Sequence, residues 1–413
     1  MVVRIRSNRI WFIAIGILFV VTAVISVHHL VSHKILPTGG SEDTTTTIKP
    51  EKNSKQVDIQ NMRGVWIPYF SLETQEHTES AFKSNFDRLI ATAKSHKMNT
   101  VIVHVRPFSD ALYPSEYYPQ SHILTGTQGE TVSYDPLEYM ITKTHESGMK
   151  FHAWINPYRI STETTPEEFS DDNIVNTLSE SSILHYKGGI YINPSSVEGR
   201  KLIIDGIKEI VENYPVDGVQ FDDYFYPDGD LSLDRKYYET YISECDSDGI
   251  VLSQTQWRKA NVNMLISAVY DSIKQIKREV IFGISPQGNI SNCSDIGADV
   301  QQWCSTYGYV DYICPQMYVN FEHAILPFDT MVEQWQELTK SQKIPLCIGL
   351  ALYKANSSDY DNGTWQNSND ILKQEVEYCQ QKGIDNFMLY DIDYFDKSHT
   401  EAEMQNLVNA LES

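Results

Sequence analysis

From residue 60 onward, short apolar runs alternate with longer amphipathic stretches. Eight runs have the length and alternation of β-strands, at 63–70, 100–108, 150–158, 217–225, 280–288, 311–319, 345–353 and 386–394. The stretches between them place apolar residues at helical spacing, as at Val262, Leu265, Ile266 and Val269. Eight strand and helix units in about 350 residues predict an α/β fold, the (β/α)₈ TIM barrel. A doubly wound open sheet is the alternative, although no GxGxxG turn follows the first strand.

Side-chain alternation along the strands predicts which residues face the interior of the barrel. In the run 100–108, three valines take the helix-facing positions, which places His104 and Arg106 inside. The same rule turns further polar and aromatic residues inward near the C-terminal ends of other strands: Trp154, Asn156, Asp222, Gln316 and Tyr318. Barrel enzymes build their sites at these strand ends. For the deeper His104, Gln220 and Ser285, a hydrogen-bonded interior network without a chemical role is the alternative.

The N-terminal segment has a different pattern. Residues 10–31 are apolar and free of charge over a length that can cross a bilayer, and Arg4, Arg6 and Arg9 precede them. The positive-inside rule predicts a cytoplasmic basic flank at 1–9 and a transmembrane anchor at 10–31; a cleaved signal peptide is the alternative. Residues 32–60 have the composition of a flexible tether. The sequence thus predicts a single-pass protein of the cell membrane, with the barrel domain, 61–413, outside the cell.

Net charge and cysteine content limit the kinds of ligand and macromolecule that the protein is expected to bind. The formal charge is −22, and the four basic residues of 1–34 have no acidic counterpart there, so the remaining chain is still more acidic. This excludes a nucleic-acid binder, because phosphate neutralisation needs basic patches. The six cysteines form no CxxC pair and no zinc-finger spacing, so no metal and no cofactor is predicted. If the domain is exported, Cys293 and Cys304 are a conceivable disulfide pair.

The predicted mouth of the barrel is rich in aromatic, amide and carboxylate side chains. Flat rings match the apolar faces of sugars, and amides and carboxylates bind hydroxyl groups, so the lining is typical of a carbohydrate cleft. Glycoside hydrolysis needs two carboxyl roles, for which Asp222 is the first candidate, with Asp223 or Glu322 as its partner. The predicted substrate-binding residues are Arg106, Asp110, Trp154, Asn156, Tyr158, Arg159, Tyr224, Gln287, Gln316, Tyr318, Tyr390 and Asp391.

Several long segments together resemble the glycosyl-hydrolase-like 10 family. They include RGVWIPYF, NTVIVHVRPFSDALYPSEYYP, FHAWINPYRI, VDGVQFDDYFYP, FGISPQGNI, DYICPQMYVNF and FMLYDIDYF, in this order along the chain. The resemblance implies a (β/α)₈ glycosidase of the bacterial cell envelope. It also implies peptidoglycan glycan as the substrate, particularly strands that lack stem peptides.

The segment around Asp222 is also similar to the DGxDxDxE signature of chitinase-like barrels, with two departures. Asp217, Gly218 and Asp222 match, but Gln220 replaces an Asp, and Tyr224 stands where those enzymes have their acid Glu. The chitinase mechanism therefore cannot be transferred unchanged. Either another residue, such as Asp223 or Glu322, acts as the general acid, or the chain has lost catalysis.

Three hypotheses follow for the function. The first is a glycosidase that acts on cell-wall polysaccharide, with peptidoglycan glycan as substrate. The second is a non-catalytic glycan-binding barrel at the cell wall, and the third is a metal-dependent carbohydrate deacetylase on the same scaffold. The stereochemical outcome, the cleaved linkage and the identity of the acid stay open, because they depend on distances between carboxyl groups.

Overall fold

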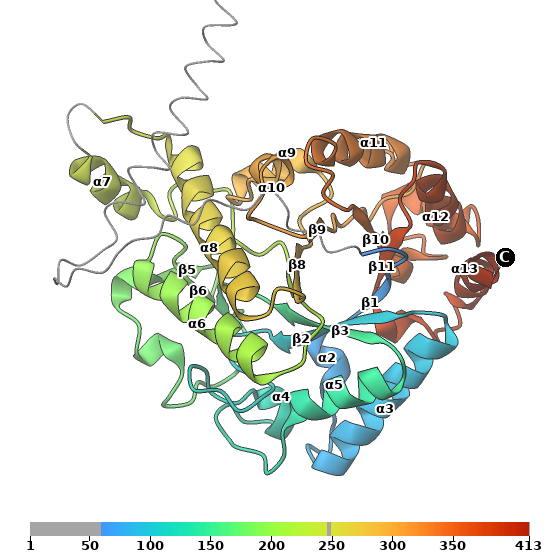
Figure 1. Cartoon of the computed structure of the whole chain (residues 1–413), viewed down its shortest axis with the longest axis horizontal. Helices are drawn as coiled ribbons and strands as arrows, with labels where there is room; N and C mark the ends of the chain where they lie inside the picture. Colours follow the sequence, from blue (N-terminus) through green and yellow to red (C-terminus); the bar gives the residue numbers. More distant parts are fainter. Residues whose placement is uncertain (1–58, 246–248, 413) are drawn as a thin grey trace, which may run out of the picture. The chain divides into compact units, whose positions relative to one another are not determined.

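The computed structural model describes residues 59–245 and 249–412, all of which belong to one compact unit. Eight parallel strands form its centre: β1 (Arg63–Ile67), β2 (Thr100–Arg106), β3 (Lys150–Ile155), β7 (Gly218–Phe221), β8 (Ile281–Ile284), β9 (Tyr312–Ile313), β10 (Cys347–Ala351) and β11 (Asn386–Tyr390). Their order is β10-β11-β1-β2-β3-β7-β8-β9 (Figure 1). Parallel bridges between Ile313 and Leu346 and between Gln316 and Gly349 join the two edges of the sheet. Each predicted strand run contains one of these strands, so the predicted TIM barrel is confirmed.

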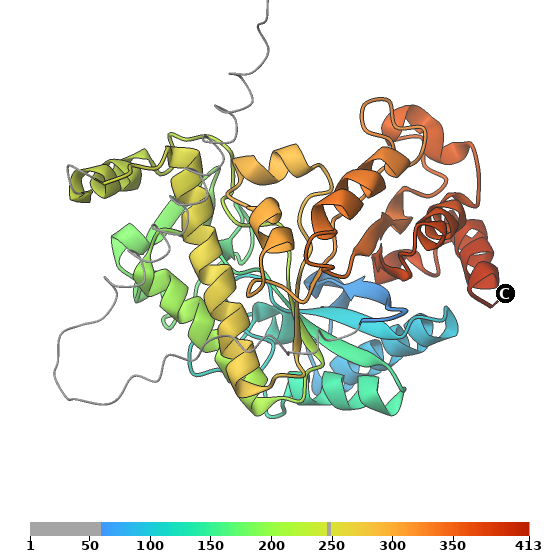
Figure 2. The ribbon, with the colours of Figure 1, turned by 45° about the horizontal axis from the view of Figure 1, so that its top comes forward.

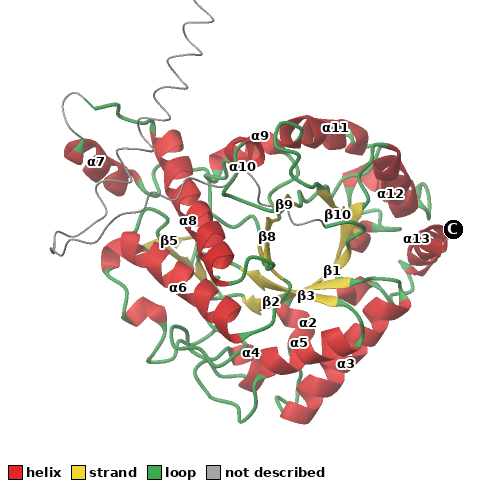
Figure 3. Cartoon of the chain, in the orientation of Figure 1, coloured by secondary structure: helices red, strands yellow, loops and turns green. Residues whose placement is uncertain are grey.

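Helices surround the ring of strands (Figure 3). The longer ones are α3 (Glu79–Ser95), α5 (Pro136–Glu146), α6 (Val197–Asn213), α7 (Arg235–Glu244), α8 (Gln254–Ile276), α11 (Phe328–Thr339), α12 (Ile371–Gln381) and α13 (Glu401–Glu412). Short helices are α2 (Tyr69–Leu72), α4 (His122–Thr125), α9 (Ile290–Asp295) and α10 (Val300–Ser305). Local sequence explains several starts: Ser253 and Gln256 form a capping box on α8, and Asp135 caps α5 before Pro136. Helices α6 and α8 pack side by side on one flank (Figure 2).

Two hydrophobic cores separate the inside of the barrel from the layer under the helices. The interior core includes Trp66, Ile102 and Tyr312, whereas the valines of β2 join the outer core. Tyr312 fits because the neighbouring strand has Gly283, where a Cβ atom would lie 2.1 Å from the Tyr312 ring. The predicted alternation of β2 is confirmed as far as His104.

The interior network predicted as an alternative exists for only one of its three members. The Gln220 amide accepts the indole N–H of Trp66 (2.6 Å) and donates to the Tyr312 hydroxyl (2.9 Å). The ring nitrogens of His104 and the hydroxyl of Ser285 have no hydrogen-bond partner in the described part of the chain. For these two residues the described part of the chain supplies no partner to such a network.

Arg106 does not face the interior, contrary to its predicted position. The pairing of β2 with β3 shifts register between His104 and Arg106, and this irregularity ends the strict alternation. The guanidinium group lies 4.4 Å from the centre of the Tyr118 ring. A Cβ atom on Gly206 of α6 would meet it at 2.5 Å. Arg106 is therefore buried between the barrel wall and α6.

The long connection between β3 and α6 contains a small antiparallel sheet that the sequence pattern did not predict. Its strands are β4 (Arg159–Ser161), β5 (Ile183–Tyr186) and β6 (Gly189–Ile192), in the order β4-β6-β5. Because β4 begins four residues after β3 ends, this sheet stands at the C-terminal end of the barrel. It carries Tyr191 toward the carboxylates described below.

The predicted N-terminal anchor and its basic flank lie outside the described residues, as does nearly all of the tether. Among the helices that the structure describes, none combines the length and the apolar character that a bilayer crossing requires. All six cysteines are described and all are free, so the conceivable Cys293–Cys304 disulfide is not formed.

Two buried carboxyl groups face each other between α12 and α13. Neither oxygen of Glu375 has a hydrogen-bond partner among the described residues, and Glu403 accepts one bond, from the backbone N–H of Leu372. Burial and the neighbouring Glu403 raise the pKa of Glu375 well above its usual range, and burial raises the pKa of Glu403 to about 7. Both groups therefore stay protonated in the folded chain at pH values where the unfolded chain has lost these protons.

We expect this pair to make the folded chain less stable as the pH rises. The stabilisation is complete below the unfolded pKa of about 4.3 and is lost as the pH rises through about 7. For Glu403 the shift corresponds to about 3–4 kcal/mol. Urea unfolding of Glu403→Gln at pH 5 and pH 8 should show a smaller pH dependence than the wild type. Glu377→Gln, an exposed change on α12, is the control, and an unchanged pH dependence in Glu403→Gln would contradict the assignment.

Candidate active site

Asp222 follows β7 at the C-terminal end of the barrel and is 4% exposed. Its Oδ2 accepts the indole N–H of Trp154 (2.9 Å) and the amide of Asn156 (3.3 Å), both supplied by β3 and its end. Its Oδ1 accepts the backbone N–H of Tyr224 (3.3 Å). Burial, together with the neighbouring charge of Asp223, raises the pKa of Asp222 to about 7. This carboxyl group is thus close to half protonated at neutral pH.

Asp223 is the more accessible member of the pair. The side-chain amide of Gln316 donates to its Oδ1 (3.0 Å) and also to the backbone oxygen of Ser285 (3.1 Å). Burial raises the pKa of Asp223, while hydrogen bonds from Gln316 and Gln287 oppose that rise. Strand-end amides thus stabilise the ionised form of Asp223, next to an Asp222 that is close to half protonated at neutral pH.

Arg159 brings positive charge to this pair. Its backbone N–H donates to Asn156 Oδ1 (3.0 Å), and its guanidinium lies between the rings of Phe108 (4.7 Å) and Tyr224 (5.1 Å). The charge of Arg159 opposes the raised pKa values of both Asp222 and Asp223. Tyr224 is 48% exposed, so one of the rings that hold Arg159 is open to solvent.

Aromatic rings line the rest of the mouth. Trp154 stacks on His104 with ring centres 3.8 Å apart and planes 8° apart. Burial, reinforced by the charge of Arg159, lowers the pKa of His104 well below its usual range, so this imidazole is neutral. Further around the ring of strands, the Tyr390 ring lies 5.8 Å from Tyr318 and 6.1 Å from Trp66. The mouth therefore offers flat apolar faces beside the carboxyl pair.

The structure thus brings together Asp222, Asp223, Trp154, Asn156, Arg159, Tyr224, Gln287, Gln316, Tyr318 and Tyr390 from the predicted set. Tyr318 follows Gln316, which donates to Asp223, and the Tyr390 ring packs 5.8 Å from the Tyr318 ring.

Other predicted residues lie elsewhere. Tyr158 is fully buried in the outer core, next to the charge of Arg200, and Arg106 is packed against α6. Glu322 accepts the amide of Asn367, and its charge does not contribute to the pKa shift of Asp222. For these three residues the structure shows no contact with the carboxyl pair within the described ranges.

Asp110 and Asp391 are buried carboxyl groups next to the mouth. Asp110 is bonded to His122 (3.1 Å) and to the amide of Gln128 (3.2 Å), which fixes the loop after β2. Asp391 follows Tyr390 directly and caps the short helix Ile392–Tyr394 by accepting the Asp393 N–H (2.9 Å). Burial raises the pKa of Asp391 to about 7.

Sequence reasoning left two mouth residues out of the predicted binding set. Tyr69 of α2 packs edge-on against Phe108 (4.9 Å) and His104 (5.7 Å). Its place at the end of the first strand run predicts it among the aromatic residues of the mouth, although not in the binding set. Tyr191 comes from β6. Burial raises its pKa, and the charge of Arg159 opposes the rise. No strand-end rule reaches Tyr191, because the extra sheet was not predicted.

Within residues 59–245 and 249–412, no group of three or more His, Cys, Asp or Glu side chains is arranged to hold a metal ion. The chemistry available at the mouth is that of a carboxyl pair, amides, one arginine and aromatic rings. Such a set can donate a proton, stabilise a positive charge and bind a sugar, which are the steps of glycoside cleavage.

The sequence matches a known protein family. The model of the glycosyl hydrolase-like 10 family matches residues 61–367. Glycosyl hydrolase YngK of Bacillus subtilis is 34% identical over 75% of this chain, and the match spans 64% of its own length. Glycosyl hydrolase DigH of Escherichia coli K12 is 31% identical over 90% of both chains.

Solved structures support the fold. The glycoside hydrolase domain of PgaB (BpsB) from Bordetella bronchiseptica has a TM-score of 0.54 at 14% identity, covering 85% of this chain and 99% of that domain. The catalytic domain of a β-amylase from Paenibacillus polymyxa has a TM-score of 0.56 at 9% identity, covering 85% of this chain and 98% of that domain. At these identities the likeness shows a shared barrel fold and no more.

Proposed function

The chain belongs to the glycosyl hydrolase-like 10 family, and we propose that it cleaves the glycan strands of peptidoglycan by acid–base catalysis at Asp222 and Asp223. The observation that carries this proposal is the adjacent carboxyl pair at the barrel mouth, in which the pKa of Asp222 is raised to about 7 by burial and by Asp223. An acid that is still partly protonated at neutral pH, beside a second carboxyl group whose ionised form is stabilised by amide donors, is the arrangement that glycosidases need.

In this proposal Asp222 supplies the proton. The C–O bond to the leaving sugar breaks as the proton moves to the glycosidic oxygen, so that the sugar leaves as a neutral alcohol. The N–H groups of Trp154 and Asn156 hold the Asp222 carboxyl group in place. They also stabilise its negative charge after the proton has been transferred. Asp223, held by Gln316, stabilises the positive charge that develops on the sugar ring. A water molecule then forms the new C–O bond at the anomeric carbon, and the proton it releases returns to Asp222.

The position of Arg159 is an argument for a substrate that carries carboxylates. The part of the chain outside 1–34 is strongly acidic, so an anionic glycan needs a local cation where it binds. Arg159 is held between two rings, one of them exposed, and its charge acts on both carboxyl groups of the pair. Peptidoglycan strands carry a carboxylate on every second sugar, and strands without stem peptides present that group freely to a guanidinium.

The proposed location is the outer face of the cell membrane. The apolar run at 10–31 and its basic flank support an anchor. The low-hydrophobicity segment 32–60 supports a tether between this anchor and the barrel. An enzyme held in this way works at a high effective concentration of wall glycan.

The test uses the full-length chain with three substrates: peptidoglycan glycan stripped of peptides, intact peptidoglycan and chitin. We expect new reducing ends, identified by mass spectrometry, at least about tenfold faster on the stripped glycan than on chitin, since only the former pairs with Arg159. Equal rates on both substrates would overturn the proposed substrate. Binding without any product on all three would overturn the proposed reaction.

We also expect Trp154→Phe to shift the pH dependence of the reaction. The indole N–H stabilises ionised Asp222, so its loss raises the pKa of Asp222 above about 7. The fall in kcat on the basic side should therefore move to higher pH, and kcat at pH 7 should fall about tenfold through the lost positioning. Tyr309→Phe, a buried aromatic change in the loop after α10, is the control. A basic limb that stays in place would contradict the role given to Trp154.

A further inference from the structure

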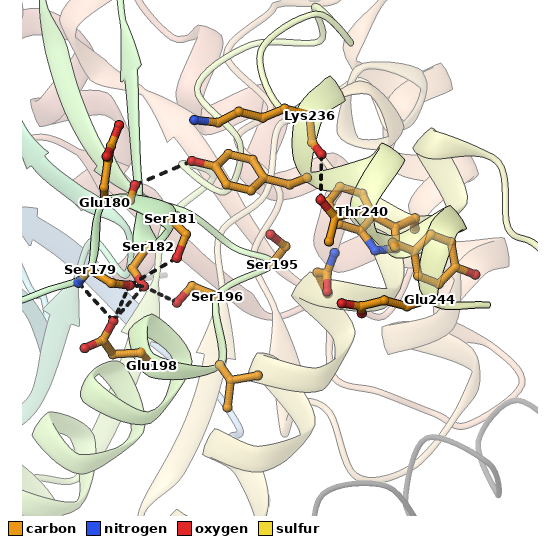
Figure 4. A pocket seen from close by; sticks show the side chains of 15 residues that line it. Ser179, Glu180, Ser181, Ser182, Ser195, Ser196, Glu198, Lys236, Thr240 and Glu244 are labelled. Atoms are coloured by element: carbon orange, nitrogen blue, oxygen red, sulfur yellow. Dashed lines mark hydrogen bonds between the residues drawn. The ribbon is translucent and has the colours of Figure 1, made fainter.

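A cavity lies outside the barrel mouth. Its volume is about 720 Å³, and it is bounded by the segment that leads into β5, the start of α6, helix α7 and the start of α8 (Figure 4). None of the residues assigned to the Asp222–Asp223 site lines it. Its volume lies within the range of about 300–1,000 Å³ that small-ligand sites occupy.

One wall of the cavity is aromatic. The ring of Tyr241 on α7 is stacked near Trp257 on α8, with centres 6.0 Å and planes 29° apart. Tyr238, which does not line the cavity, packs against Tyr241 at 5.9 Å and 29°. The Tyr241 hydroxyl accepts the backbone N–H of Leu252, which fixes the orientation of its ring. This wall presents a flat, ordered apolar surface of the kind that packs on a sugar ring.

The facing wall is made of hydroxyl groups arranged around one carboxylate. Glu198 Oε2 accepts the hydroxyls of Ser179 (2.7 Å) and Ser182 (2.8 Å), and Ser182 is in turn bonded to Ser196 (2.6 Å), as Figure 4 shows. The hydrogen bonds from Ser179 and Ser182 lower the pKa of Glu198, so the group is ionised at neutral pH. Glu198 Oε1 accepts no hydrogen bond from any residue that the structure describes. This wall thus offers the free acceptor Glu198 Oε1, which the bonds from Ser179 and Ser182 to Oε2 hold in a fixed position.

The charge of the cavity limits its ligand. Glu180, Glu198 and Glu244 contribute carboxylates and Lys236 contributes the one cation among its lining residues. The excess of negative charge disfavours anionic ligands. An uncharged ligand with an apolar ring face and several hydroxyl donors matches both walls.

We infer that this cavity is an accessory glycan-binding subsite outside the catalytic mouth, and that it holds one uncharged sugar, such as the sugar between two carboxylate-bearing ones in a peptidoglycan strand. The choice of a glycan rests on the function proposed above. The hairpin β5–β6 connects the two places, because Ser182 stands before β5 while Tyr191 on β6 lies near Arg159. The Tyr186 hydroxyl also bonds to Asp228, in the loop that follows the carboxyl pair.

The test measures hydrogen–deuterium exchange of the full-length Asp222→Asn chain with tetra-N-acetylchitotetraose, an uncharged probe. We expect slower exchange in segments 195–198 and 236–244, and no such effect with tetragalacturonate, which carries a carboxylate on each sugar. Tyr241→Ala should weaken the apparent affinity at these segments at least about fivefold, whereas Tyr241→Phe, which keeps the ring, should stay within about twofold. Tyr307→Ala, a change at a tyrosine that is 67% exposed and does not line the cavity, is the matched control.

If Tyr241→Ala does not fold, Ser181→Trp fills the cavity from an exposed position on its rim and should abolish the protection. No protection at 195–198 and 236–244 with the uncharged probe would overturn the accessory subsite, whatever happens at the mouth. Protection at these segments with no product from the wild-type chain on any glycan would instead overturn the proposed reaction and leave the subsite supported. Equal protection by both probes would overturn the assigned uncharged ligand.

Discussion

Replacing Asp222 with Asn is expected to lower kcat at least about 100-fold on the substrate that the wild-type chain cleaves. The substitution keeps the size of the side chain and its contact with Trp154, but it removes the proton that the buried carboxyl holds near neutral pH. Because the lost interaction concerns a proton transferred in the transition state, KM should change much less than kcat. Steady-state kinetics of the full-length chain would measure both.

The pH profile separates the roles of the two carboxyl groups. The wild type should follow a bell-shaped curve that falls above about pH 7, as Asp222 loses its proton, and falls on the acid side, as Asp223 becomes protonated. Asp223→Asn should also lower kcat at least about 100-fold. Its residual activity should decline at a lower pH than that of the wild type, because the charge that raises the pKa of Asp222 is gone.

The control for this pair is Asp385→Asn, an exposed carboxyl change just before β11, at the opposite end of the barrel, which should leave kcat within about twofold of the wild type. Full activity in Asp222→Asn would show that another carboxyl supplies the proton. Glu322 and Asp391 would then be the residues to replace next, since both are sequence candidates and burial raises the pKa of Asp391 to about 7.

The barrel could be predicted from the sequence because its signal is local and repeated. Each strand is a short apolar run that ends in polar or aromatic residues, and the helices between the runs have their own period. The same rule located Asp222, Trp154 and Asn156 at one end of the barrel, where the structure joins them by hydrogen bonds. When strands and helices alternate regularly along a chain, few topologies besides the (β/α)₈ barrel are possible.

The failures came from features that strict alternation does not encode. A register shift in β2 turns Arg106 toward α6, and no residue in the run 100–108 allows this shift to be predicted from the sequence. Tyr158 follows the strand-end motif but points into the outer core, while the neighbouring Arg159 reaches the carboxyl pair. Tyr191 was missed because the β4–β6–β5 sheet depends on pairing between segments separated by a long loop. Each of these positions is decided by tertiary contacts and not by the local pattern.

The loop that begins with Asp222 and Asp223 is held by one buried ion pair. Arg258 on α8 and Asp234 at the start of α7 have no exposed side-chain surface and are joined by two hydrogen bonds, of 2.9 Å and 2.7 Å. The same guanidinium donates to the backbone oxygens of Asp228 (3.1 Å) and Asp230 (2.7 Å). This contact connects the catalytic loop to the flank of the barrel that carries the accessory cavity.

Arg258→Met is therefore expected to destabilise the fold by about 3–5 kcal/mol, because it leaves the Asp234 carboxylate buried without its cation and releases two backbone oxygens. Urea unfolding at pH 7 measures this loss, with Lys340→Met as the control, since Lys340 and Glu337 form an exposed pair that contributes less than about 1 kcal/mol. The double change Arg258→Met with Asp234→Leu should recover much of the stability, as it removes the unpaired charge, yet kcat should stay low because Asp228 and Asp230 remain unanchored. Recovery of kcat together with stability would mean that Arg258 acts on the fold alone and does not order the loop of the carboxyl pair.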